Sequence, residues 1–235
     1  MTIFAERLAE AIRSHHNLPQ FTESMTLEAG YELQKEVANL VSPNGFAGIK
    51  AGITSPKLQQ AFGIKHALLG RLYEHGRLKS GEEIKFIDKQ IIECEIGITV
   101  NSKGELLSAG LALEFAFATF SSPKDATAPN LAAANVAADK FLLGPMFPLR
   151  DNYDDVTIKL FRDNTLINEA SITEALGGPI EAVKWIVKEA EKYNIKLSDS
   201  ELLMTGACGQ VVPALPGNYR ADYGTLGQVN FTIVE

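Results

Sequence analysis

Cysteine and histidine are scarce in this sequence of 235 residues. The two cysteines, Cys94 and Cys208, exclude a disulfide framework and also a zinc site built from several thiolates. The four histidines include no pair with HExxH spacing, and none stands beside a pair of cysteines. The sequence therefore carries no recognisable zinc motif, and we expect both thiols to be reduced.

Positive charge is also in short supply. Lys and Arg together number 22 against 29 Asp and Glu, which gives a formal net charge of -7. Nucleic-acid-binding proteins concentrate Lys and Arg, so this balance argues against a nucleic-acid partner. It gives no support to binding at an anionic membrane surface either.

Long apolar runs are missing as well. No stretch approaches the ~20 apolar residues of a membrane span. The first residues include Glu6 and Arg7 and lack the apolar run of a signal peptide. We therefore expect a cytoplasmic protein without a membrane partner.

The composition that remains is typical of a globular protein. The hydrophobic fraction of 46% and the length predict one large domain that folds without disulfides or a structural metal. Helical spacing of apolar residues predicts helices over 2–14 and 26–41, after Ser55-Pro56, over the Ala-rich stretch 131–139, and from Pro179 onward. Period-2 alternation predicts strands over 46–53, 91–100 and 229–233, with residues 64–90 as a connector.

These elements predict an α+β fold, in which a helical N-terminal portion packs on a β-rich body. We place the N-terminal portion at residues 1–80 and the β-rich body at residues 81–235, as parts of one cooperative unit. The sequence contains no internal repeat and no long linker.

The strand predicted at 91–100 carries two acids in one phase. Its apolar residues occupy one face, so Glu93 and Glu95 share the opposite face with Cα atoms roughly 6.5–7 Å apart. Two carboxylates placed in this way can converge on a hard divalent cation, which prefers oxygen ligands. The pattern is equally that of a solvated strand face, where Glu-x-Glu is common.

A third acid, Glu114, stands alone among small residues. In Leu111–Ala118 the large apolar residues take one phase, and the other phase holds three alanines and Glu114. A buried acid needs a partner, and a metal ion supplies one. An exposed glutamate, or one bonded to a backbone amide, is the alternative.

Lys50 lies between Gly48 and Gly52 on one face of the strand predicted at 46–53. Glycine leaves room for a ligand or for close approach of another backbone. A lysine in such a cleft either binds a carboxylate or loses its proton and acts as a base. The alternative is an ordinary surface lysine.

Thr205 and Gly206 follow an apolar run that ends at Met204. A strand that runs into a loop of small residues with a hydroxyl forms a plausible anion cradle, although any tight turn has a similar composition. Cys208 lacks a histidine placed to act as its base, so a nucleophilic cysteine is disfavoured.

Taken together and in order, these segments resemble the fumarylacetoacetate hydrolase superfamily, on the branch of the 2-oxopent-4-enoate hydratases and 4-oxalocrotonate decarboxylases. The resemblance runs over nearly the whole chain. It is carried by Gly30-Tyr31-Glu32-Leu33-Gln34, Gly48-Ile49-Lys50-Ala51-Gly52, Gly70-Arg71-Leu72, Glu93-Cys94-Glu95-Ile96, Leu113-Glu114, Phe141-Leu142-Leu143-Gly144, Leu176-Gly177-Gly178-Pro179, Leu203-Met204-Thr205-Gly206 and Tyr223-Gly224-Thr225-Leu226-Gly227.

The resemblance implies a roll-like α+β fold and a homo-oligomer. It implies Mg²⁺ or Mn²⁺ held by Glu93, Glu95 and Glu114, with Lys50 as the active-site lysine. Thr205, with Gly206 beside it, falls where the family binds the substrate carboxylate. The expected substrate is a small 2-oxo acid, which chelates the metal so that the cation stabilises the enolate.

The chain departs from the family pattern at the other end of the site. Residues His66–Gly70 lack the acid of the Pro-Asp-Phe-Gly-like stretch of the family. Thr119 stands where the family commonly has an arginine, and Ala134-Asn135 stands where it has an Asp-Asn pair. We expect a metal-dependent lyase. The frequency of hydratases in the family favours a 2-keto-4-pentenoate-type hydratase, whereas the missing acid favours the alternative, a 4-oxalocrotonate-type decarboxylase. An acylpyruvate-type C–C hydrolase, which needs a histidine–carboxylate pair, and a non-catalytic scaffold on the same fold are further alternatives.

Overall fold

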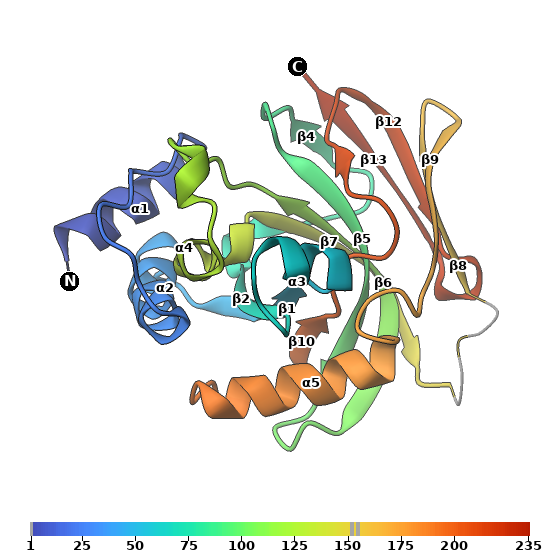
Figure 1. Ribbon diagram of the computed structural model, residues 1–235. Helices are drawn as coiled ribbons and strands as arrows, with labels where there is room; N and C mark the ends of the chain where they lie inside the picture. Colours follow the sequence, from blue (N-terminus) through green and yellow to red (C-terminus); the bar gives the residue numbers. More distant parts are fainter. Residues whose placement is uncertain (1, 151–152, 154–155) are drawn as a thin grey trace.

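The computed structural model describes residues 2–150, 153 and 156–235. Two curled sheets form the body, and helices cover one end and one flank of the larger sheet (Figure 1). The helices are α1 (Ile3–Arg13), α2 (Leu27–Val41), α3 (Pro56–Ala61), α4 (Ala128–Ala133) and α5 (Pro179–Lys192). Mixed helix and strand around a curled sheet confirm the predicted α+β class.

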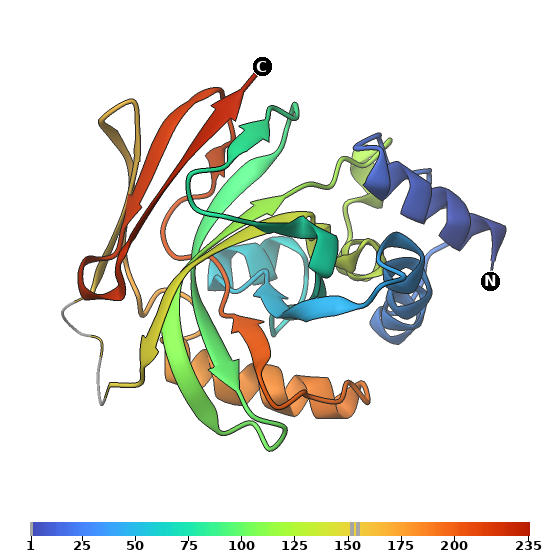
Figure 2. The ribbon, with the colours of Figure 1, turned by 180° about the vertical axis from the view of Figure 1, so that it is seen from behind.

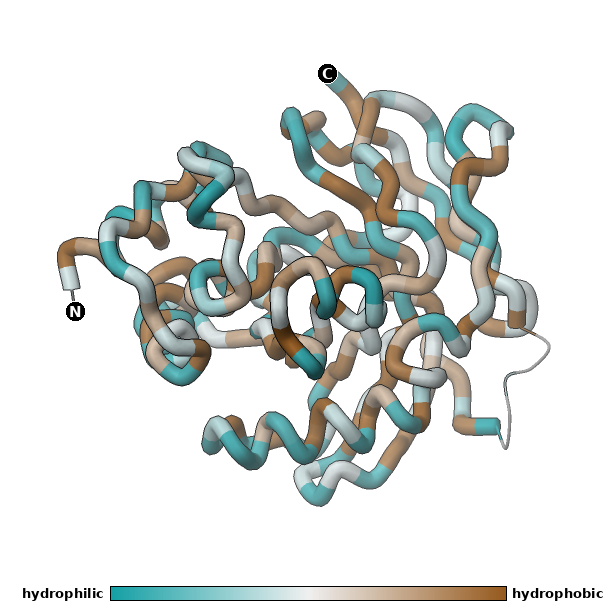
Figure 3. Tube along the Cα trace, viewed as in Figure 1, coloured by the Kyte–Doolittle hydropathy of each residue, from teal (hydrophilic) through white to brown (hydrophobic). Residues whose placement is uncertain are grey.

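The helices begin where the sequence places their caps. The side chains of Thr2, Thr26 and Ser55 each accept a hydrogen bond from the backbone N–H three residues later, which satisfies one free donor at each helix start. Helix α5 begins with a proline after Gly178 instead. In Figure 3 the α5 tube alternates between hydrophilic and hydrophobic colours, as expected of a helix with one face on the core.

The larger sheet has the strand order β2-β1-β10-β5-β6-β7-β3, and β11 pairs with β5. Strand β2 also contacts β7, so the sheet curls round on itself, as Figure 2 shows from behind. Its strands are β1 (Phe46–Gly52), β2 (Leu68–Tyr73), β3 (Arg77–Leu78), β5 (Ile91–Val100), β6 (Leu106–Ala116), β7 (Lys140–Pro148), β10 (Glu201–Met204) and β11 (Val212–Pro213).

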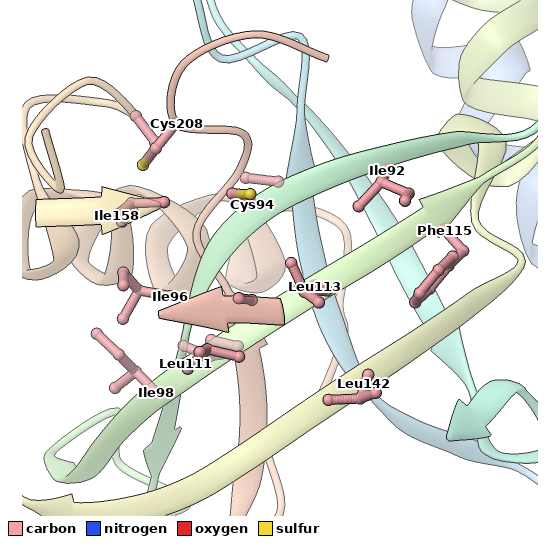
Figure 4. Packing of buried hydrophobic residues seen from close by; sticks show 14 of the residues in the cluster. Ile92, Cys94, Ile96, Ile98, Leu111, Leu113, Phe115, Leu142, Ile158 and Cys208 are labelled. Atoms are coloured by element: carbon pink, nitrogen blue, oxygen red, sulfur yellow. The ribbon is translucent and has the colours of Figure 1, made fainter. Parts of the chain in front are cut away.

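The smaller sheet has the order β4-β13-β12-β8-β9 and packs against the outside of the curl. Ile92, Cys94 and Ile96 of β5 lie beside Leu113 of β6 and face Ile158 of this second sheet in an apolar layer (Figure 4). Its strands are β4 (Glu83–Lys85), β8 (Thr157–Arg162), β9 (Thr165–Ser171), β12 (Gly217–Asp222) and β13 (Gln228–Val234).

The opposite face of β5 points into the curl. The register pairs Glu93 with Glu114, Glu95 with Ala112, and Gly97 with Gly110. Because side chains alternate along a strand, both acids of β5 and the acid of β6 project to the same side. The curl therefore gathers these acids on its inner face, while the apolar residues between them build the core.

The structure corrects two elements of the sequence prediction. Residues 64–90 are more than a connector, because they contain β2, which completes the sheet beside β1. The Ala-rich helix spans Ala128–Ala133 rather than 131–139, and a short 3₁₀ turn at Asn135–Ala137 follows it. Thr127 caps that helix, and a backbone with positive φ at Asn135 ends it.

The predicted division at residue 80 does not coincide with a break in the sheet. Strands β1 and β3, from the first 80 residues, pair with β10 and β7 respectively. Among the described residues, no helix is long and apolar enough to cross a membrane.

Candidate metal centre

Three glutamates meet inside the curled sheet. Glu93 and Glu95 come from β5, and Glu114 lies directly opposite Glu93 on β6. One carboxylate oxygen from each residue lies within 4.8 Å of the other two. Glu95 and Glu114 are fully buried, and Glu93 is partly exposed. The two strands thus bring together the three acids that the sequence singled out.

The carboxylates of this cluster repel one another, so a bound cation would stabilise them. Burial, the neighbouring Glu114 and the other acids raise the pKa of Glu95 well above its usual range, and burial together with Glu114 raises the pKa of Glu93 to about 7. Oε1 of Glu95 is buried and makes no hydrogen bond. Buried carboxylates without partners are costly, and oxygen donors are what a hard divalent cation prefers. The donor set therefore fits a divalent metal ion.

Lys50 supplies one positive charge to the cluster. Its ammonium donates a hydrogen bond to Oε2 of Glu114 at 3.0 Å and lies 2.9 Å from Oε1, and the side chain is buried. Burial by itself would lower the pKa of Lys50, but Glu114, Glu93 and Glu95 together raise it above its usual value. Lys50 is therefore an ammonium ion in this environment, suited to bind an anion or donate a proton.

Two glycines make room for the lysine side chain. Gly70 is its cross-strand neighbour on β2, and a Cβ there would lie 3.0 Å from Cε of Lys50. At Gly52 a Cβ would lie 3.5 Å from Nζ of Lys50 and 2.5 Å from Cγ1 of Val136. The Gly-x-Lys-x-Gly pattern reflects this close packing, and Gly70 extends it to the next strand.

The loop after β10 reaches the same cluster. The N–H of Gly206 donates a hydrogen bond to Oε2 of Glu95 at 2.7 Å, and the hydroxyl of Thr205 accepts one from the N–H of Ile96 at 3.3 Å. Gly206 has φ +96°, and a Cβ there would lie 2.3 Å from Cγ2 of Thr54. The predicted anion cradle thus holds a glutamate of the cluster, and its contact with a substrate stays a prediction.

One neighbour of the site has a role that the residue pattern did not reveal. The buried Asn135 accepts the N–H of Arg71 at 2.7 Å and donates to its C=O at 2.8 Å, so its amide pairs with the outer edge of β2. Asn135, Val136 and Ala137 all have φ between 52° and 60°. Three successive non-glycine residues in this region are unusual, and no residue pattern signals them.

The cysteines and His15 do not belong to the cluster of glutamates. Burial raises the pKa of Cys94 to about 11 and of Cys208 to about 12, which leaves both as thiols and disfavours a nucleophilic role. His15 lies 2.9 Å from Asp139, which also accepts a hydrogen bond from Gln90. This pair lines a cavity that contains none of the three glutamates.

Comparison with known proteins gives full-length matches at low identity. No family model matches the chain. A 2-keto-4-pentenoate hydratase of Burkholderia vietnamiensis is 24% identical, and the match covers 98% of this chain and 96% of the hydratase.

Solved structures agree on the fold. A 4-oxalocrotonate decarboxylase from Pseudomonas putida G7, solved with magnesium and adipate, has a TM-score of 0.89 at 19% identity over 98% of this chain and 96% of its own. A fumarylpyruvate hydrolase from Pseudomonas aeruginosa, solved with Mn²⁺ and pyruvate, has a TM-score of 0.60 at 12% identity over 79% and 88%. In sequence and in fold, the chain is thus similar to these members of the fumarylacetoacetate hydrolase superfamily over most of its length.

Proposed function

We propose that this protein is a lyase that depends on Mg²⁺ or Mn²⁺ and hydrates an unsaturated 2-oxo acid of the 2-keto-4-pentenoate type. The observation that carries the proposal is the buried cluster of Glu93, Glu95 and Glu114 with Lys50 bonded to Glu114. The similarity to a hydratase over 98% of the chain supports the same reaction class.

The residues of the site have different roles in the proposed reaction. Glu93, Glu95 and Glu114 would hold the metal, which supplies a Lewis acid for the enolate of a 2-oxo acid. The Gly206 N–H keeps Glu95 in place, because it is bonded to that carboxylate. Lys50, which donates a hydrogen bond to Glu114, binds the substrate carboxylate or returns a proton to the substrate carbon. Burial of Lys50, Glu95 and Glu114 limits access of bulk water.

We place hydration ahead of decarboxylation because the curated relative that matches over 98% of this chain is named a hydratase. A decarboxylase substrate carries a second, distal carboxylate, which needs a second cation. Thr119 stands where the family commonly has an arginine, so this position supplies no cation. We therefore propose a monocarboxylate substrate with a neutral tail.

A proton NMR time course tests the proposal. Protein with Mg²⁺ is mixed with 2-hydroxypenta-2,4-dienoate and, separately, with 4-oxalocrotonate, each beside a Glu93→Gln/Glu95→Gln control. We expect 4-hydroxy-2-oxopentanoate to form from the dienoate with the wild type alone. Loss of the distal carboxylate from 4-oxalocrotonate instead would identify a decarboxylase.

A metal titration separates a wrong substrate from a wrong site. Mg²⁺ should raise the melting temperature of the wild type and leave the Glu93→Gln/Glu95→Gln variant unchanged, because a ligand stabilises only a fold that binds it. Neither turnover nor stabilisation would favour a non-catalytic scaffold. The oligomeric state stays a prediction of the family resemblance, which size measurement in solution checks.

A further inference from the structure

A second cavity lies on the other face of the sheet from the metal centre. Arg71 is paired with Ile49 in the β1–β2 register, one residue away from the Lys50–Gly70 pair, so its side chain projects to the opposite side from Lys50. The cavity has a volume of about 380 Å³ and lies between α2, β2 and the segment that follows α5. This volume is within the range of sites that bind small molecules.

Arg71 is the innermost charge of this cavity. Its guanidinium lies over the Phe46 ring, 4.4 Å from the centroid, which fixes the plane of the group. Nε is buried and makes no hydrogen bond, and among the described residues Arg71 has no carboxylate within ion-pair distance. Glu201 acts on Arg71 only through the electrostatic field of its charge. The Glu201 carboxylate instead accepts a hydrogen bond from the N–H of Ser198. The guanidinium therefore has unused donors.

The other charged groups of the lining reinforce this positive character. Lys35 and Lys196 line the cavity with Arg71, and Glu32 is the one acid among the described lining residues. The balance is three positive groups against one negative, in a chain whose net charge is -7. Glu189 and Glu28 also act on Tyr193 through their charge, and Lys192 binds the carboxylate of Glu189 at 3.0 Å. A local excess of positive charge attracts an anion.

Aromatic rings form the walls. The rings of Tyr31 and Tyr193 lie 4.0 Å apart between centroids, and Phe46 is on the side of Arg71. Lys192 lies 4.8 Å from the centre of the Tyr193 ring, on the outer side of this wall. Flat aromatic walls beside a guanidinium without an ion-pair partner suit a planar molecule that carries one acidic group.

We propose that this cavity binds a small planar carboxylic acid, with its carboxylate on Arg71 and its flat body against the aromatic walls formed by Tyr31, Phe46 and Tyr193. The site is separate from the metal centre. A carboxylate between Arg71 and the two lysines would satisfy donors that the folded chain leaves unused.

Isothermal titration with benzoate tests the site, and benzamide serves as the neutral analogue. The metal-free Glu93→Gln/Glu95→Gln variant is used so that chelation at the metal centre does not contribute. We expect benzoate to bind at least about tenfold more tightly than benzamide, because a charge-assisted hydrogen bond to the partly buried guanidinium of Arg71 distinguishes them. Equal affinity for the two probes, or no binding of either, would overturn the proposal.

Variants locate the bound probe. Arg71→Met and the exposed pair Lys35→Gln/Lys196→Gln should each weaken benzoate binding, whereas the matched surface pair Lys103→Gln/Lys188→Gln should leave it unchanged. If Arg71→Met fails to fold, the lysine pair decides. Benzoate binding that survives these changes and disappears in Lys50→Met would place the probe beside the catalytic lysine and contradict a separate site.

Discussion

Lys50 is the residue whose environment most constrains the chemistry. It sits on a strand between glycines, touches both oxygens of Glu114 and lies in the field of three acids. The sequence predicted a lysine in a cleft but left open whether it binds a carboxylate or acts as a base. The surrounding carboxylates favour the ammonium form, because they stabilise positive charge more than burial destabilises it.

Replacing Lys50 with Met should separate metal binding from turnover. We expect turnover of the dienoate to fall by at least about 100-fold, as for loss of a proton-transfer group. Affinity for Mg²⁺ should stay the same or increase, because a competing positive charge is gone. Calorimetry with Mg²⁺ and the NMR assay measure the two effects, with the exposed Lys57→Met as control. Loss of Mg²⁺ binding would mean that Lys50 instead holds the cluster together.

The pH dependence of stability follows from the raised pKa values of the glutamates. Because the folded protein holds a proton on Glu93 up to about pH 7, well above its ordinary value of 4.5, the metal-free protein should be most stable below about pH 4.5 with respect to this group. This contribution should be lost as the pH rises through about 7, by at most about 3 kcal/mol at 1.36 kcal/mol per pKa unit.

Urea unfolding between about pH 5 and about pH 8, with chelator and with Mg²⁺, measures this dependence. Saturating Mg²⁺ should flatten it, because the cation takes the place of the proton. The Glu93→Gln variant should be flatter than the wild type without metal, and Glu191→Gln, an exposed acid on α5, should behave as the wild type. A wild-type stability that rises over this range would contradict the raised pKa values.

At the scale of elements, the turn after α4 holds the edge of the large sheet. Asn135 satisfies both main-chain groups of Arg71, and Val136 packs against Gly52 beside Lys50. The edge strand β2 is thereby protected from pairing with another chain. The same contacts place this turn against the glycines that flank the lysine.

Asn135→Ala should therefore destabilise the fold by about 2 kcal/mol or more, because it leaves the Arg71 N–H and C=O without partners. Asn194→Ala is the matched control, since Asn194 has φ +55° but is exposed. The Asn194→Ala variant reports only the free-energy cost of placing alanine where the backbone has a positive φ. Equal destabilisation in urea unfolding of the two variants would show that the bonds to Arg71 contribute nothing.

Elements with a strong periodic pattern could be predicted from the sequence, and those fixed by distant partners could not. Helix α2 and strand β5 carry their caps and alternation in their own residues. Strand β2 lacks a clear alternation of apolar and polar residues, because Gly70 points inward and Arg71 points outward. Its pairing with β1 therefore decides its structure. Likewise, strand periodicity placed Glu93 and Glu95 on one face, and the family resemblance joined Glu114 to them. The role of Asn135 could not be predicted, because it bonds to a strand that only the fold brings near.

At the scale of the whole molecule, the large sheet ties the two ends of the chain together. Strand β1 lies between β2 and β10, and β10 lies between β1 and β5. Neither the segment 1–80 nor the segment 81–235 contains a complete set of partners for its own strands. The two segments share one sheet.

We therefore predict that residues 81–235 expressed alone do not fold cooperatively, because β10 and β7 lose β1 and β3 and expose their edges. Circular dichroism during urea unfolding should show a broad transition for the fragment and a single sharp one for the whole chain. A sharp transition of the fragment would establish residues 81–235 as an independent domain. Mixing the two fragments tests whether the missing strands restore the fold.

The place of β10 also determines when the protein can fold during its synthesis. Lys50 of β1 is paired in parallel with Met204, which leaves the ribosome more than a hundred residues later. At about 5–20 residues per second, β1 and β5 wait on the order of ten seconds for the strand that joins them. Two apolar strand edges stay open in the nascent chain during that time, and pairing so distant in sequence is slow to form. Folding of this protein is therefore completed only near the end of translation, and the nascent chain depends on protection from aggregation until then.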